Sequence, residues 1–221
     1  MKIKKNLDVL LYEKIKDGFL KCEYKLGEKI DIDQLAEKYE VSRTPIIQAI
    51  KRLENEGMME TGRGGKVSIP RYDAKKICDV YNVRILLEQY AMRCICEQGI
   101  RKDFSKMRTY ADECDAGYAT GDIVMASKAD LNFHKAIIKQ ANNACLSSVY
   151  SKVQGQCMVV NYLLSSTPKD HQESCKRDHR EIIDSLENFE LDKTCSLLEN
   201  HLKRNVQRLL EILPYVEQAE E

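Results

Sequence analysis

Four side chains in the second half of the sequence are of the types that bind divalent metals. Asp130 and His134 are four residues apart, so a helix there would place both on one face. His179 and His201 lie in two further stretches of helical periodicity, and three converging helices would combine one carboxylate with three imidazoles. Such a set leaves positions open for water or a ligand on a divalent ion such as zinc, nickel or manganese. A surface pair or a hydrogen-bonded core pair explains the same spacing, so the residues alone leave both interpretations open.

These side chains depend on helices that the periodicity predicts between residues 74 and 213. Asp73 fits the N-cap of the first helix, over residues 74–98. Apolar residues at helical spacing predict the others near residues 102–120, 122–140, 144–164, 172–187 and 191–213. Strand signals are almost absent, so we expect an antiparallel bundle of about six helices. His171 follows Pro168 and is expected in a loop.

A second stretch, residues 31–53, has the pattern of two short helices around a tight turn. Asp31 fits the N-cap of the first helix and Ser42 that of the second. The exposed residues at the start of the second helix are then Arg43 and Thr44. A short helix that presents Arg and Thr at its N-terminal end, braced by another helix, is typical of a DNA-reading helix-turn-helix. An ordinary helical hairpin is the alternative.

The residues that follow, 61–70, predict a hairpin. TGRGGKVSIP places Gly64 in the turn, with Arg63 and Lys66 beside the tip. A basic hairpin after a helix-turn-helix is a wing, suited to phosphate or minor-groove contact. The predicted fold class is therefore mainly α: an N-terminal winged helix-turn-helix and a C-terminal antiparallel bundle of about six helices.

The N-terminal part of the sequence resembles a known family. Residues 6–70, with VSRTP, a spaced A-x-x-x-L and EG, are similar to the winged helix-turn-helix of the GntR family of bacterial transcriptional regulators. The resemblance implies DNA contact by Ser42, Arg43 and Thr44 on the reading helix and, in the wing, by Arg63, Gly64 and Lys66. Two positions depart from the pattern. Glu40 stands where the family usually has Gly, and Ile47 replaces a second Arg, which removes one expected contact.

The remainder, about residues 73–213, resembles the FCD effector-binding domain of the FadR-type branch of that family. The matching pieces are VRILLE, DLNFHKAIIKQANN, DHREIIDSL and HL. The resemblance implies a divalent metal bound by Asp130, His134, His179 and His201, with Asp178 in place of the usual Glu. It also implies that Arg84 binds an effector carboxylate, for which a guanidinium is suited. Pairing of Arg84 with Glu88, four residues on, is the alternative.

Composition limits the functional classes. The 221 residues carry a formal net charge of zero, with a mildly basic first third and a mildly acidic remainder, which fits one DNA-contacting domain and one that avoids DNA. Nine scattered cysteines favour reduced thiols in a cytoplasmic protein over a redox or iron–sulfur role. Neither a signal peptide nor an apolar run of about 20 residues is expected, so we predict no membrane association.

Together these patterns predict a ligand-responsive regulator, with DNA binding in residues 1–71 and effector binding in residues 72–221. We expect a homodimer on a near-palindromic double-stranded operator and a small carboxylate as effector. Two alternatives stay open: a metal-dependent helical-bundle enzyme, or a pure metal-ion sensor with an appended DNA-binding domain. No H-E-x-x-H, Walker loop, nucleophile elbow or CxxC is present in the sequence, so we expect no catalysis.

Overall fold

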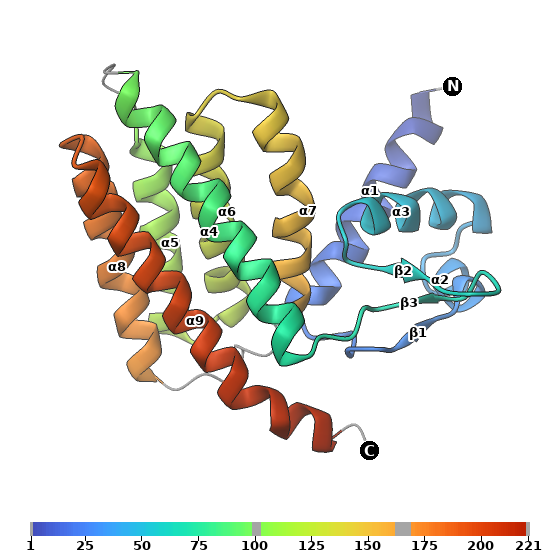
Figure 1. Cartoon of the computed structure of the whole chain (residues 1–221). Helices are drawn as coiled ribbons and strands as arrows, with labels where there is room; N and C mark the ends of the chain where they lie inside the picture. The colour runs from blue at the N-terminus through green and yellow to red at the C-terminus, as the bar shows by residue number, and fades with distance from the viewer. Residues whose placement is uncertain (1, 99–102, 162–168, 220–221) are drawn as a thin grey trace.

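The computed structural model describes the backbone of residues 2–98, 103–161 and 169–219, and the side chains of residues 7–98, 103–161 and 177–214. The fold is mainly α, with a winged helix-turn-helix followed by a helical bundle, which confirms the predicted class (Figure 1). The two parts lie side by side, and the chain passes between them after the third strand.

The N-terminal part combines helices with a small antiparallel sheet. Its elements are α1 (Lys2–Leu20), β1 (Lys29–Ile30), α2 (Ile32–Lys38), α3 (Arg43–Asn55), β2 (Glu60–Thr61) and β3 (Val67–Ser68). The strand order is β1-β3-β2, with Lys29 opposite Ser68 and Thr61 opposite Val67. Strands β2 and β3 form the predicted hairpin. Gly64 in its turn has a φ of 83°, a conformation that glycine adopts without a steric penalty.

The two helices of the helix-turn-helix have one confirmed N-cap and one that differs from the prediction. Asp31 caps α2 by accepting a hydrogen bond from the backbone N–H of Asp33 at 2.8 Å. Ser42 occupies the N-cap position of α3, but its side chain makes no capping hydrogen bond. Pro45 explains this in part, because it occupies the third helical position and lacks an N–H that a cap would accept. Glu40 has a φ of 54°, a left-handed conformation that disfavours a non-glycine residue by about 1 kcal/mol.

The C-terminal part is the predicted bundle. Its helices are α4 (Ala74–Glu97), α5 (Ser105–Thr120), α6 (Ile123–Gln140), α7 (Ala144–Asn161), α8 (Lys169–Glu187) and α9 (Leu191–Ala219). Helix α8 begins before the predicted residue 172, so the expectation that His171 lies in a loop is wrong. Pro168 directly precedes the helix, and a proline is compatible with a helix start although it stops helices elsewhere.

Two expectations from composition can be compared with the fold. In the described part of the chain, every helix is too short or too polar to span a lipid bilayer. None of the eight cysteines that the structure describes forms a disulfide, and several of them are buried or half-buried.

The two parts meet where the end of α3 lies against α7. The Glu56 carboxylate at that end accepts a hydrogen bond from the Tyr12 hydroxyl of α1 at 2.7 Å. A Cβ on Gly155 of α7 would lie 2.1 Å from the Glu56 carbonyl oxygen, so only glycine allows this approach. The neighbouring Gln154 donates a hydrogen bond to the backbone carbonyl of Leu131 on α6 at 2.8 Å. Helices α3, α7 and α6 are therefore linked by direct contacts.

Candidate functional site

Asp130, His134, His179 and His201 come together inside the bundle although they belong to three helices. Asp130 and His134 lie on α6, His179 on α8 and His201 on α9. One ligand atom from each residue lies within 4.8 Å of those of the others. The three imidazoles are buried and Asp130 is half-buried. We call these residues the Asp–His cluster; that it binds a metal remains a prediction.

Packing holds the imidazole rings of the cluster in place. The ring of His179 stacks on Phe133, with centroids 4.1 Å apart, and the rings of His134 and His201 stack at 5.3 Å. Asp130 Oδ1 lies 3.3 Å from Nε2 of His179 and 3.7 Å from Nε2 of His134. The carboxylate thus stands between two imidazoles that come from different helices.

Glu88 of α4 orients His134 from behind. Its Oε2 lies 2.7 Å from Nδ1 of His134, and its Oε1 accepts hydrogen bonds from Arg84 Nε and the Tyr150 hydroxyl, each at 2.7 Å. Burial alone would raise the pKa of Glu88, but His134 and Arg84 lower it to about 2. An ionised carboxylate can only accept, so the proton of His134 lies on Nδ1 and Nε2 presents its lone pair to the cluster.

Asp178 orients the ring of His201 as Glu88 orients that of His134. Its Oδ2 lies 3.1 Å from Nδ1 of His201 and also accepts a hydrogen bond from Arg204. Burial works against ionisation, yet His201 and Arg204 lower the pKa of Asp178. Two of the three imidazoles are therefore each held by a carboxylate outside the cluster, an arrangement typical of metal-binding histidines.

The pKa shifts within the cluster indicate a site that favours positive charge. Burial raises the pKa of Asp130, but His134 and His179 outweigh it and hold that pKa well below its usual range. Burial and the positive charge of Arg84 lower the pKa of His134. The carboxylates of Glu88 and Asp130 outweigh both effects, so the pKa of His134 is raised. Burial lowers the pKa of His201 to about 4 despite Asp178. The cluster thus offers one ionised carboxylate, one neutral imidazole and a local potential that attracts positive charge.

Unpaired nitrogen atoms give a direct test of whether these residues fit a metal ion. Within the described part of the chain, no hydrogen-bond partner is found for Nε2 of His134, Nε2 of His201 or either ring nitrogen of His179. A buried polar atom left without a partner costs about 1–3 kcal/mol. Several such atoms around one point are accounted for if they coordinate a divalent ion, and three imidazoles with one carboxylate are a suitable donor set.

Arg84 is buried, with only 1 % of its surface exposed. Two roles were considered for it: pairing with Glu88 and binding of an effector carboxylate. Its pairing with Glu88 is present, but as a buried contact rather than a weak surface pair. Its Nη2 is buried and has no hydrogen-bond partner among the described residues. A donor held in this way is suited to an incoming carboxylate, and this role stays a prediction.

Sequence reasoning missed the positioning roles of Glu88 and Tyr150. A signal for Glu88 was present, because Arg84 and Glu88 continue the stripe of α4 that carries the buried Ile77 and Tyr81. Charged residues in register with a buried apolar stripe indicate an internal polar network. For Tyr150 the sequence holds no comparable signal, since its contact with Glu88 spans 62 positions.

The residues predicted to contact DNA form an exposed surface on the N-terminal part. Ser42, Arg43 and Thr44 are exposed around the start of α3, and Arg63, Gly64 and Lys66 are exposed at the hairpin turn. The side chain of Arg43 forms an ion pair with Asp33 at 3.0 Å, and both remain about two-thirds exposed. Arg43 is therefore accessible, and its contact with DNA remains a prediction.

Comparison with known proteins agrees with both parts of the chain. The model of bacterial regulatory proteins of the gntR family matches residues 9–69, and the FCD domain model matches residues 79–204. The chain is 23 % identical to "Uncharacterized HTH-type transcriptional regulator YdhC" of Bacillus subtilis over 91 % of this chain and 90 % of that protein. It is 24 % identical to the Nta operon transcriptional regulator of Aminobacter aminovorans, over 86 % and 88 % of the two chains.

Solved structures share the fold. McbR/YncC of E. coli superposes with a TM-score of 0.80 at 16 % identity, covering 93 % of this chain and 97 % of that chain. A GntR regulator from Rhodococcus sp. RHA1 gives a TM-score of 0.77 at 19 % identity, covering 96 % and 99 %. Together, the domain matches over most of the chain, the relatives and the shared fold show that this protein belongs to the GntR family of transcriptional regulators and carries a C-terminal FCD domain.

Proposed function

We propose that this regulator is a homodimer that binds a near-palindromic operator and responds to a small carboxylate bound at the Asp–His cluster. DNA binding is assigned to residues 1–71 and effector binding to residues 72–221. The observation that supports this most directly is the group of buried, unpaired imidazole nitrogens beside an ionised Asp130. Such a group is costly to maintain in a purely structural core.

The cluster and Arg84 would divide the recognition of the effector between them. When bound, a divalent ion such as zinc, nickel or manganese would supply positive charge and open coordination positions for a carboxylate oxygen. Glu88 holds Arg84 Nε on one side, while Nη2 is left as a buried donor. Because Glu88 also orients His134, the guanidinium and the cluster are joined through one carboxylate. A second carboxylate, brought by the effector, suits the remaining donor.

Helices α6 and α7 provide a route from the cluster to the reading helix. Asp130 precedes Leu131, whose carbonyl accepts the hydrogen bond from Gln154 of α7. The adjacent Gly155 lies against Glu56 at the end of α3. A shift of α6 on effector binding would thus change where α3 sits. The effector changes DNA affinity only by binding two such arrangements with different affinity.

The rival functions make different predictions in one experiment. Full-length protein, metal-loaded or stripped by a chelator, is titrated with acetate, succinate and malate. The readouts are calorimetry, product detection by NMR, and anisotropy of a labelled DNA fragment selected from a random pool. We expect binding without turnover, only in the metal-loaded protein, together with a change in DNA affinity. Turnover would favour the enzyme, and a DNA response to metal alone would favour the pure metal sensor.

Arg84→Lys sharpens this test, because lysine keeps the charge but loses the fork geometry that binds both carboxylate oxygens. We expect carboxylate binding to weaken about tenfold or more while the metal content stays unchanged. Arg180→Lys on α8 is the matched control, since Arg180 lies on the surface in ion pairs with Asp112 and Asp115. Equal carboxylate binding by Arg84→Lys and the wild type would remove Arg84 from the effector site.

A further inference from the structure

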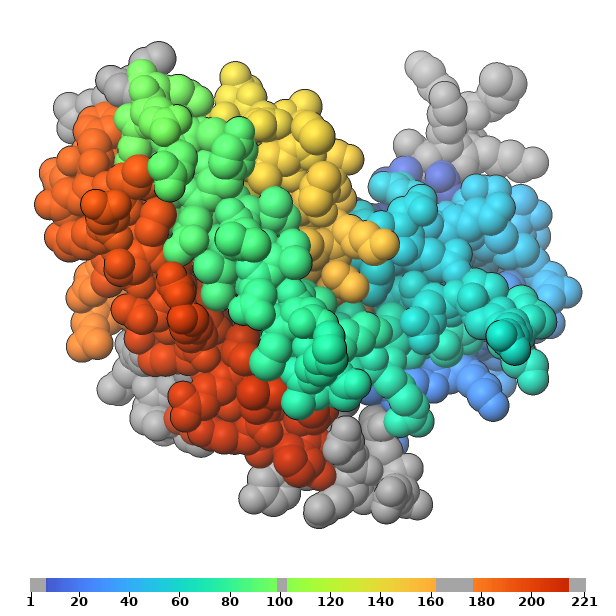
Figure 2. Space-filling model, viewed as in Figure 1, coloured from blue at the N-terminus to red at the C-terminus, as the bar shows by residue number. Residues whose placement is uncertain are grey.

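A groove on the bundle lies between helices α5, α6 and α7. It encloses about 510 Å³, a volume within the range of about 300–1,000 Å³ for small-molecule sites. Helices α4 and α9, in green and red, form the front of the bundle in Figure 2, and α5 and α6 lie behind them in Figure 1. None of the four residues of the Asp–His cluster lines the groove, so within the described part of the chain it is a separate cavity.

The walls of the groove carry positive charge and, among the described residues, no carboxylate. Lys106 on α5 and Lys135 and Lys139 on α6 line it, and all three are exposed. Lys135 and Lys139 lie one helical turn apart and form no ion pair with any residue that the structure describes. The chain holds 35 acidic and 35 basic residues, so three amines around one cavity without an acidic residue create a positive local potential. The groove therefore favours an anionic ligand.

Lysine, rather than arginine, indicates the kind of anion. The planar fork of arginine matches a carboxylate, whereas the lysine ammonium is a compact point charge whose three donors can turn towards the oxygens of a phosphate. A phosphate monoester carries about 1.5–2 negative charges at neutral pH, which two or three amines can neutralise. Ala136, Ile138 and Tyr110 add apolar surface and Asn132 adds an amide, so the rest of the ligand can be organic.

The floor of the groove is connected to the Asp–His cluster. Tyr150 is buried below the groove, and its hydroxyl donates a hydrogen bond at 2.7 Å to Glu88, which orients His134. Gln154 also lines the groove and donates a hydrogen bond to the backbone carbonyl of Leu131 at 2.8 Å. A ligand in the groove would therefore contact two side chains that link α7 to α4 and α6.

We propose that the groove is a second ligand site and that it binds a phosphate ester of a small organic molecule. The three lysines bind the phosphate, and the apolar wall contacts the organic part. The proposal does not depend on the proposed function, because no residue of the Asp–His cluster and none of the residues assigned to DNA contact lines the groove.

Calorimetry on the full chain tests the site with matched pairs of probes. AMP and phenyl phosphate carry the phosphate, whereas adenosine and phenol have the same organic part without it. The protein is first stripped by a chelator, because a cation in the Asp–His cluster would itself attract phosphate. We expect the phosphorylated probes to bind and the neutral ones not to bind. The proposal is overturned if neither phosphorylated probe binds at millimolar concentration, if adenosine binds as AMP does, or if binding requires the metal-loaded protein.

Substitution of the lysines tests the charge. Lys135→Gln and Lys139→Gln change exposed side chains, so both variants should fold, and each should raise the Kd for AMP about tenfold. Lys203→Gln is the matched control, since Lys203 is exposed on α9 and its loss changes the net charge equally. Equal weakening in all three variants would overturn the proposal. Retained AMP binding in the two groove variants, with a flatter salt dependence of DNA affinity, would assign these lysines to the DNA backbone and would also overturn it.

A bulky side chain tests the location without a change of charge. Ser147 is exposed on α7 and lines the groove, so Ser147→Phe should block the cavity and abolish AMP binding. Ser148→Phe is the control, because Ser148 is also exposed but does not line the groove, and neighbouring positions on a helix point in different directions. Both variants should melt as the wild type does. Undiminished AMP binding by Ser147→Phe would show that the phosphate binds elsewhere.

Discussion

Glu88 Oε2 lies 2.7 Å from Nδ1 of His134, and this contact determines which nitrogen of the imidazole faces the Asp–His cluster. Glu88 is fully buried and its pKa is lowered to about 2, so it remains an acceptor over the whole range in which the protein would function. The carboxylate therefore acts on the cluster without being part of it, by fixing the ring and its tautomer.

The first prediction follows from this contact. Glu88→Gln keeps the shape of the side chain but removes the charge that orients His134 and pairs with Arg84. We expect the affinity for zinc, measured by competition with a chelating dye, to fall about 10–100-fold. Glu181→Gln, an exposed change on α8, is the control and should bind zinc as wild type does. Unchanged affinity in Glu88→Gln would mean that His134 needs no such partner.

Metal removal gives the second prediction. A ligand that binds only the folded state stabilises it by about 2.7 kcal/mol at a hundredfold excess over its Kd, so chelation should lower the melting temperature. His179→Ala should melt lower than wild type and should no longer respond to the chelator. Asp184→Ala, on the exposed side of the same helix, should respond as wild type does. The hypothesis fails if protein purified without an affinity tag contains no stoichiometric ion and added divalent metals leave the melting temperature unchanged.

The third prediction concerns the contact between the two parts of the chain. Gly155→Ala would place a Cβ 2.1 Å from the Glu56 carbonyl, so α3 must shift relative to α7. We expect a loss of about 1–3 kcal/mol in stability and a weaker response of DNA binding to the effector, with metal affinity retained. Ser151→Ala, exposed on α7 one turn earlier, should leave all three unchanged. A full effector response in Gly155→Ala would exclude this contact as the route of coupling.

How far the sequence predicts this molecule depends on how local each signal is. The bundle, the hairpin and the Asp31 cap follow from periodicity and from residues within a few positions of one another. The resemblance to the family pointed to the cluster, because single histidines 45 and 22 positions apart carry no spacing signal. The support from Glu88 and the contact of Gly155 with Glu56 arise only when distant helices meet. The absence of a capping hydrogen bond to Ser42 could have been predicted, since Pro45 lacks the backbone N–H that would donate it.

The fourth prediction concerns the reading helix. Arg43 is exposed at the start of α3 and its ion pair with Asp33 is at the surface, so it is available to a base edge. Arg43→Ala should weaken binding to the selected operator by about 1–3 kcal/mol and relax the sequence preference. Lys51→Ala, exposed near the end of α3, is the control and should leave sequence preference unchanged. Wild-type affinity for both operator and random DNA in Arg43→Ala would show that Arg43 is not a reader.

The fifth prediction concerns the wing and uses salt as the probe. Arg63 and Lys66 flank the exposed hairpin turn, where they can neutralise phosphates whatever the sequence. Each phosphate contact contributes nearly one unit to the slope of log affinity against log salt, so Arg63→Ala or Lys66→Ala should flatten that slope by about one. Affinity should fall for operator and random DNA alike, in contrast to Arg43→Ala.

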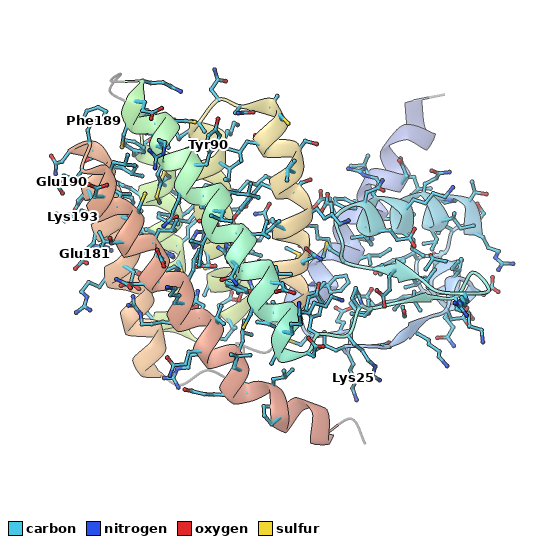
Figure 3. All side chains as sticks on the ribbon, viewed as in Figure 1. Lys25, Tyr90, Glu181, Phe189, Glu190 and Lys193 are labelled. Atoms are coloured by element: carbon cyan, nitrogen blue, oxygen red, sulfur yellow. The ribbon has the colours of Figure 1, made fainter. Side chains whose placement is uncertain are left out.

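A lysine elsewhere on the same part of the chain provides the control for the wing. Lys25 is exposed in the segment before β1, and Figure 3 places it at the bottom of the N-terminal part, away from the hairpin tip. Lys25→Ala removes the same charge from the protein as Lys66→Ala, so a general effect of net charge would alter both slopes equally. We expect the wild-type slope for Lys25→Ala. An unchanged slope in both wing variants would exclude the hairpin from phosphate contact. Equal flattening of the slope in all three variants would show that long-range attraction, and not direct contact by the wing, causes the salt dependence.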